Sequence, residues 1–195
     1  YGENPYKSPT DMGVNMIGFC LSDEEVCSDA ARAEIIRRHY DALNRYALGA
    51  DNENEVNKIA LIMKQAKLTT DYRKPTIAAR ERKEQWNCPA AAIELHDGTI
   101  IKAGSSELLG PSAALILNAT KHLAGIPHEV KLIPQSMIEP IQRTKVSFLH
   151  GHNPRLHTDE VLVALSLLST TDENCRRALE QLPKFDGCQV HSTVM

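Results

Sequence analysis

The densest group of chemically active side chains in the sequence lies between His150 and Glu160. The segment reads His-Gly-His-Asn-Pro-Arg-Leu-His-Thr-Asp-Glu, and a largely apolar stretch, 161–168, follows it directly. Three imidazoles, an amide, a guanidinium and two carboxylates therefore stand where a loop is expected to become a buried helix. Because buried polar groups need partners, this segment is the first candidate for a binding or catalytic site.

An anion site is the chemistry that these residue types favour. Thr158 is expected to cap the following helix, whose free N–H groups and positive dipole end attract negative charge. Arg155 can hold a phosphate or carboxylate through two hydrogen bonds, and His157 can carry a proton. Asp159 is placed to orient His157 or to hold a magnesium ion. The candidate ligand-binding residues are Asn153, Arg155, Thr158 and Glu160, and the candidate catalytic residues are His157 and Asp159.

Two other interpretations of this segment remain open. His152 and His157, with His150 or Asp159, are ligand types that suit zinc, but their spacing matches no established zinc motif. We therefore expect no bound zinc. In the purely structural alternative, the Asn-Pro pair forms a turn, the acidic residues cap a helix, and Arg155 pairs with a local carboxylate.

A second polar loop spans residues 5–15, where two prolines and a glycine restrict the backbone. A rigid loop of this kind can present Lys7 and Asp11 to a ligand. It lacks the spacing of a phosphate-binding P-loop, and the alternative is a linker that enters a domain. The candidate ligand-binding residues here are Lys7, Ser8, Thr10 and Asn15, and Asp11 is a candidate catalytic or magnesium-binding residue.

A third loop, residues 104–112, is rich in serine and precedes an expected helix. Its hydroxyl groups and the helix start at Ser112 could hold an anion. Hydroxyl-rich loops before helices are nevertheless ordinary capping chemistry, so we expect no binding site there.

The pattern of apolar residues changes near residue 88. Before it, three amphipathic helices are expected: one from the capping box at 22–25 to Gly49, one at about 53–67 and one at 75–86. After it, we expect a β-hairpin at 90–102, a strand at 130–133, a last strand at 188–194, and helices at 112–124, 139–149, 158–168 and 173–182. This order predicts an α/β fold (α+β overall). A polar entry loop at 1–19 and a small helical subdomain at 20–88 precede a layered α/β domain with a mixed sheet at 89–195.

Composition excludes several classes of function. The chain has 195 residues and a net charge of −3, from 22 basic and 25 acidic side chains mixed along it. This balance predicts no nucleic-acid or membrane partner. The five cysteines form no Cys-x-x-Cys pair, which favours reduced thiols in a cytoplasmic protein. The missing initiator Met and a last strand that stops at the end of the chain indicate a fragment of a longer polypeptide.

Four separated motifs resemble the bacterial family called domain of unknown function 1846. They are residues 4–16, 89–95 with the Asp-Gly turn at 97–98, 153–160, and 178–184 with the His-Ser-Thr at 191–193. The resemblance covers essentially the whole chain. It implies that this chain is the C-terminal part of a longer protein, preceded by an α/β region with a P-loop-like, glycine-rich segment. It also implies a cytidine-deaminase type of layering, although the zinc motifs of deaminases are missing here.

Together, the polar loops and the resemblance favour a soluble enzyme that depends on a nucleotide or phosphate ligand. This chain would form half of its cleft, with loops 5–15 and 150–160 facing a shared small anionic ligand and the missing N-terminal domain as a partner. A nucleotide and Mg²⁺ would be the cofactors of the longer protein. The competing hypothesis is a non-catalytic assembly module whose helices mediate homo-oligomerisation, which predicts an exposed apolar patch on those helices.

Overall fold

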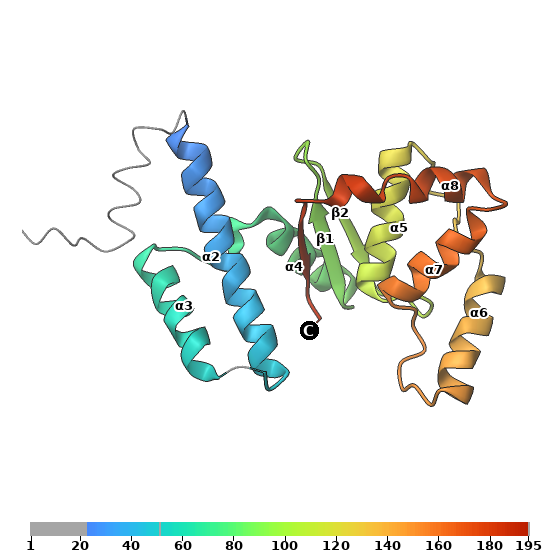
Figure 1. Ribbon diagram of the computed structural model, residues 1–195, viewed down its shortest axis with the longest axis horizontal. Coiled ribbons are helices and arrows are strands. Elements are labelled where there is room, and N and C mark those ends of the chain that lie inside the picture. Colours follow the sequence, from blue (N-terminus) through green and yellow to red (C-terminus); the bar gives the residue numbers. More distant parts are fainter. Residues whose placement is uncertain (1–22, 51, 195) are drawn as a thin grey trace, which may run out of the picture. The chain divides into compact units, whose positions relative to one another are not determined.

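The computed structural model describes residues 23–50 and 52–194 (Figure 1). The chain forms two compact units, Tyr1–Tyr72 and Arg73–Met195. The candidate residues Lys7, Ser8, Thr10, Asp11 and Asn15 lie outside the described residues. Within the described ranges, no helix combines the length and the apolar character that a membrane span needs.

The first unit is helical, as the sequence predicts. Helix α2 (Glu24–Ala47) begins after Asp23, whose carboxylate accepts a hydrogen bond of 3.0 Å from the Val26 amide. It ends before Gly49, which adopts a left-handed φ of 70°, a conformation that glycine allows without steric cost. Helix α3 (Glu53–Gln65) follows, and a short 3₁₀ turn (Thr70–Tyr72) closes the unit.

The second unit is built on a three-stranded antiparallel sheet with the order β2-β1-β3. Strands β1 (Ala90–Glu94) and β2 (Ile100–Gly104) form the predicted hairpin. Its turn contains Gly98 at a φ of 81°, a left-handed conformation that explains the Asp-Gly pair. Strand β3 (Gln189–Ser192) pairs with the other edge of β1, close to where the sequence places the last strand.

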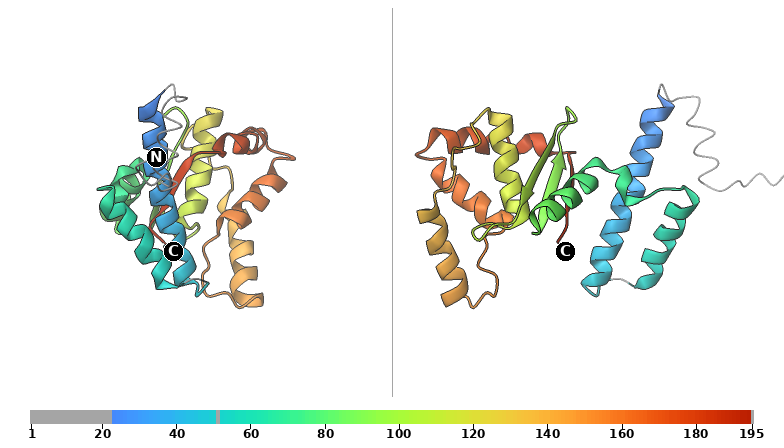
Figure 2. Two further views of the ribbon diagram at one scale, coloured as in Figure 1. Left: turned by 60° about the vertical axis from the view of Figure 1, so that its left-hand side comes forward. Right: turned by 180° about the vertical axis from the view of Figure 1, so that it is seen from behind.

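Helices α4 (Lys74–Trp86) and α5 (Pro111–Ala124) cover opposite faces of this sheet (Figure 2). Successive residues of a strand point to opposite faces. Ala91 and Ile93 accordingly pack with residues of α5, whereas Ala92 packs with Ala78 and Ala79 of α4. Because α4 covers the sheet, the unit begins at Arg73 and not near residue 89, where the sequence places the start of the layered domain.

The remaining helices surround a second apolar cluster in the same unit. They are α6 (Gln135–Arg143) with a π-helical turn (Thr144–Phe148), α7 (Thr158–Leu168), and α8 (Glu173–Leu179) with a 3₁₀ turn (Leu182–Phe185). Leu156, Val161 and Leu165 are fully buried in this cluster and fix the start of α7. The layered α/β architecture is thereby confirmed. The prediction of a mixed sheet is wrong, because both strand pairings among the described residues are antiparallel. The resemblance to the cytidine-deaminase type of layering stays a prediction.

The strand predicted at 130–133 does not form, and that prediction is wrong. Leu132 and Ile133 are buried in the helical cluster instead. Side chains bind the carbonyl groups of this segment: Nζ of Lys121 donates to the Val130 oxygen at 3.3 Å, and Sγ of Cys175 to the Leu132 oxygen at 3.1 Å. Apolar residues in a short run can be buried by helices as well as by a sheet, so their pattern alone does not predict a strand.

Candidate functional site

The segments that lead into α5 and α7 run side by side. Leu109 and Leu156 form an isolated parallel β-bridge outside the named strands. The Leu156 amide donates to the Leu108 oxygen at 2.9 Å, and the Gly110 amide donates to the Leu156 oxygen at 3.0 Å. Because both segments run in the same direction and a helix follows each, the N-terminal ends of α5 and α7 lie next to each other (Figure 1).

A pocket of about 490 Å³ opens at these two helix starts. Crevices beyond the carboxyl ends of parallel strands are common ligand sites in α/β proteins. The bridge between Leu109 and Leu156 resembles that arrangement with a single parallel residue pair. Its lining comes from the residues just before β1, after β2 and after β3, from both helix starts and from the loop before α7. These residues are Pro89, Ser105, Gly110, Pro111, Ser112, Ala113, Asn153, Arg155, His157, Thr158 and Val194.

The start of α5 presents backbone donors without a capping side chain. Gly110 is the N-cap residue and makes no side-chain cap hydrogen bond. Pro111 occupies the first turn, where its missing N–H is harmless. The amides of Ser112 and Ala113 follow at the positive end of the helix dipole, and both residues line the pocket.

Arg155 supplies the cation of the pocket. Its Nε donates to the Ser106 carbonyl oxygen at 2.6 Å, and its own amide donates to Oδ1 of Asn153 at 3.1 Å. A guanidinium has five N–H donors, so one bond through Nε leaves the two terminal amino groups to receive an anion. Ser106 therefore fixes the guanidinium of Arg155, and Asn153 fixes its backbone.

His157 stands at the start of α7, where its ring meets Asn153. Nδ2 of Asn153 lies 3.1 Å from Nε2 of His157. An amide nitrogen can only donate, so this contact leaves Nε2 of His157 as the acceptor. The predicted role of Asp159 in orienting this imidazole is therefore performed by an amide in the structure.

Glu160 is held behind the pocket by two hydrogen bonds. Its Oε2 accepts from the His157 amide at 2.7 Å and from Nζ of Lys145 at 2.9 Å. Burial acts to raise the pKa of Glu160, but the bonds from His157 and Lys145 outweigh burial and lower that pKa. Lys145 also donates to the Arg155 carbonyl oxygen at 2.9 Å, so one ammonium ties the loop to the helix.

The N-cap of α7 is His157, and Thr158 is the first helical residue. The prediction that Thr158 caps this helix is therefore wrong by one position. The capping function belongs to Glu160, the third helical residue, whose carboxylate satisfies the N-cap amide. Thr158 still lines the pocket.

His157, Asp159 and Glu160 have donor atoms within 4.8 Å of one another, as a metal site would require. Both hydrogen bonds to Glu160 end on Oε2, from a backbone amide and an ammonium, so a cation there would compete with Lys145. Asp159 is exposed to solvent. The absence of zinc remains a prediction.

Four of the candidates from the sequence meet at this pocket: Asn153, Arg155, His157 and Thr158. Asp159 and Glu160 do not line it. The opposite wall includes residues of the loop at 104–112, where the sequence predicts helix capping and no binding site. The signal that could have found it is Gly110-Pro111, a helix start without a capping side chain.

The fold and the pocket define this chain as a helical unit followed by a layered α/β unit with a polar pocket at paired helix starts. The chain belongs to the DUF1846 family. Residues 1–67 match the model described as "Domain of unknown function DUF1846, N-terminal", and residues 71–195 match "Domain of unknown function DUF1846, C-terminal". The change from one model to the other falls close to the boundary between the two structural units at Tyr72.

Curated relatives carry the name "UPF0371 protein". The chain is 50% identical over 194 residues to one from Corynebacterium aurimucosum, 46% identical to one from Corynebacterium glutamicum and 42% identical to one from Streptococcus pneumoniae. In each case the match covers 100% of this chain and 39% of the relative. The chain therefore spans about two fifths of the length of these relatives.

Proposed function

We propose that the pocket at the starts of α5 and α7 binds the phosphate or carboxylate group of a small anionic ligand. In this proposal the chain supplies an anion-binding part of a nucleotide- or phosphate-dependent enzyme. The parallel pairing of Leu109 with Leu156 carries the argument, because it places two helix starts and Arg155 around one pocket. Each element alone is common in proteins, whereas their convergence is what an anion site needs.

The charges around the pocket support this assignment. Each helix start contributes roughly half a positive elementary charge, and Arg155 adds a full one. Asp159, next to Thr158, is exposed to solvent, and the ion pair of Glu160 with Lys145 balances the charge of Glu160. His157, whose imidazole Asn153 holds in place, would donate or accept a proton at the bound anion.

Phosphate titration of the full chain tests the proposal. Arg155→Ala should raise the Kd for inorganic phosphate about tenfold, which corresponds to the loss of one charge-assisted bidentate contact. The melting temperature should change little, because Arg155 is exposed and the buried Leu156 that follows it is retained. Isothermal titration calorimetry and a thermal melt give the two quantities.

Arg143→Ala is the matched control, because it removes the same charge from an exposed position of α6 in the same unit. It should leave the phosphate affinity unchanged. If Arg155→Ala unfolds the chain while the folded fraction keeps its phosphate affinity, Arg155 has a structural role and the proposal fails.

An assembly module is the second candidate function, and one observation favours it. Large apolar side chains on and beside α2 and α3 are exposed, with Leu48 at 83%, Leu61 at 56% and Ile62 at 47%. A helical surface of this kind can mediate contacts between subunits. A stable oligomer in sedimentation experiments, without any anion affinity, would favour this candidate over the first.

A further inference from the structure

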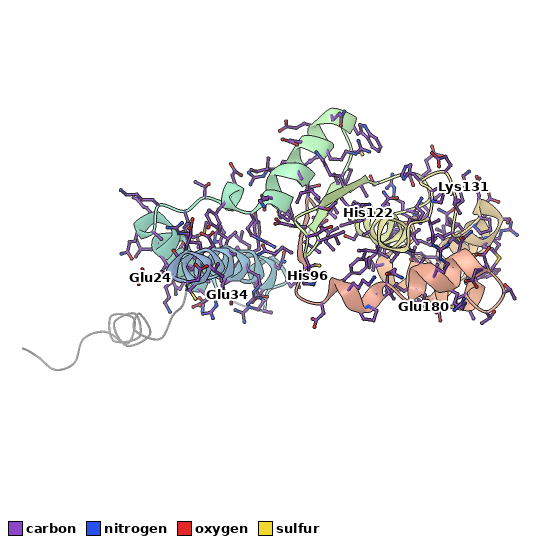
Figure 3. The ribbon with its side chains drawn as sticks, turned by 90° about the horizontal axis from the view of Figure 1, so that it is seen from above. Glu24, Glu34, His96, His122, Lys131 and Glu180 are labelled. Atoms are coloured by element: carbon purple, nitrogen blue, oxygen red, sulfur yellow. The ribbon has the colours of Figure 1, made fainter. Side chains whose placement is uncertain are left out.

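A second pocket, of about 470 Å³, lies along β2, the edge strand, between α4 and the C-terminal half of α5. Five of its lining residues are basic: Arg82, Lys102, Lys121, His122 and His128. None of the described residues that line it is acidic. Figure 3 labels His122 on α5.

Lys121 is the most buried of these cations, with 8% of its surface exposed. Its ammonium donates to the carbonyl oxygens of His128 at 2.8 Å and of Val130 at 3.3 Å. Among the described residues, no carboxylate forms an ion pair with it. A buried charge that meets only neutral oxygens has a large desolvation cost, which an anionic ligand would offset.

Arg82 is the second cation without a carboxylate partner among the described residues. Its guanidinium carbon lies 2.9 Å from the centroid of the Trp86 ring, and Nη1 donates to the Gln85 side chain at 3.3 Å. Its Nε atom is buried and has no hydrogen-bond partner. This N–H therefore lacks the partner that buried donors in proteins nearly always have.

Nearby acids do not cancel the positive charge of the lining. Glu81 pairs with Lys102 at 3.1 Å and balances that one cation. Glu129 acts on Lys121 and Asp97 on His122, but both carboxylates are exposed, so solvent screens them. The negative end of α5 contributes only about half a charge against the full charges of Arg82 and Lys121.

We infer that this pocket is a second anion site, which binds a small phosphate-bearing anion with at least two negative charges. The buried ammonium of Lys121 and the unsatisfied Nε of Arg82 are its principal donors, with Lys102 and the two histidines at its rim. On α5 the nearest lining residues of the two pockets are Ala113 and Asn118, a rise of about 7.5 Å, and no residue lines both pockets, so they are distinct sites.

Inorganic pyrophosphate is the probe, and Trp86 is the reporter because it is the single tryptophan of the chain and lies under Arg82. Pyrophosphate should change the Trp86 fluorescence of the full chain in a saturable way. Lys121→Met, which keeps the apolar part of the side chain, should raise the Kd for pyrophosphate about tenfold. Lys102→Gln, at an exposed position of the lining, should also raise this Kd.

Arg82→Gln should raise the Kd measured by calorimetry by a similar factor, and it keeps the proposal testable if Lys121→Met does not fold. Lys83→Gln is the control, since it removes a cation from the neighbouring position of α4 that does not line the pocket. Arg155→Ala should leave the Trp86 response intact, which separates this site from the one at the helix starts. An unchanged Kd in folded Arg82→Gln, or loss of the response in Lys83→Gln or Arg155→Ala, would overturn the inference.

Discussion

Glu160 shows how a single residue joins the candidate site to the helix behind it. Its carboxylate accepts hydrogen bonds from the N-cap amide of α7 and from Lys145. Lys145 in turn holds the carbonyl group of Arg155. Glu160 therefore has a positioning role. It fixes the loop that presents Arg155 and His157, and it does not itself line the pocket.

Glu160→Gln should lower the free energy of unfolding by about 1 kcal/mol at pH 7, because a capping and charge-assisted bond is weakened. The lowered pKa of Glu160 means that its contribution is present above the pKa of the unfolded state, which is about 4.3. This contribution is lost as the pH falls through the lower, folded-state pKa. Urea unfolding at several pH values measures the difference, which should disappear in acid. Exposed Glu107→Gln is the control, and a difference that persists at pH 2 would contradict the assignment.

At the scale of the elements, small residues let two helices approach the same strand. Ala90, Ala91 and Ala92 of β1 are fully buried between α4 and α5. Gly104, at the end of β2, is a second point of close approach. A Cβ atom at this position would lie 2.9 Å from a ring carbon of Trp86 and 3.0 Å from Sγ of Cys88. The absence of a side chain there lets the end of α4 pack against β2.

Gly104→Ala should therefore destabilise the chain by about 1–3 kcal/mol, since a ring and a sulfur must move to admit the methyl group. This cost exceeds the smaller gain expected from restricting the unfolded chain. In a Trp86→Leu background the same substitution should cost less, because the closest contact is gone. Chemical denaturation of the four proteins of this cycle gives the coupling energy. Equal costs in both backgrounds would mean that Trp86 does not set the constraint.

At the scale of the whole molecule, the chain consists of two compact units. All three buried apolar clusters that the structure defines lie in Arg73–Met195. Both pockets discussed above lie there too. The two family models change over between residues 67 and 71, just before this unit begins. The layered unit therefore carries its own core and its own candidate sites.

The segment Arg73–Met195 should fold by itself as a cooperative unit, because its sheet and helices already bury one another. A sigmoidal urea transition monitored by circular dichroism and by Trp86 fluorescence would show this. The two probes should report coincident transitions. Broad or non-coincident transitions would show that the core needs residues of the first unit.

The sequence alone determined the elements whose signals are local. The Asp97-Gly98 turn, the apolar spacing of α2 and the Gly125 end of α5 are all encoded within a few neighbouring residues. Local chemistry also identified Arg155 and His157 as a candidate pair. The turn and helix predictions succeeded because turn conformation and helix periodicity depend on contacts between residues close in the chain. The role of Arg155 and His157 stays a prediction.

Only the tertiary structure decided which distant segments meet. The bridge between Leu109 and Leu156 places the start of α5 opposite Arg155, and no local pattern encodes that pairing. In the same way, Ala79 belongs to the layered unit because it packs on the sheet, although its own segment reads as one more amphipathic helix. Leu132 and Ile133 are buried by helices and not by strands. An apolar segment can be buried by helices or by strands, so the element that buries it depends on packing across the whole unit.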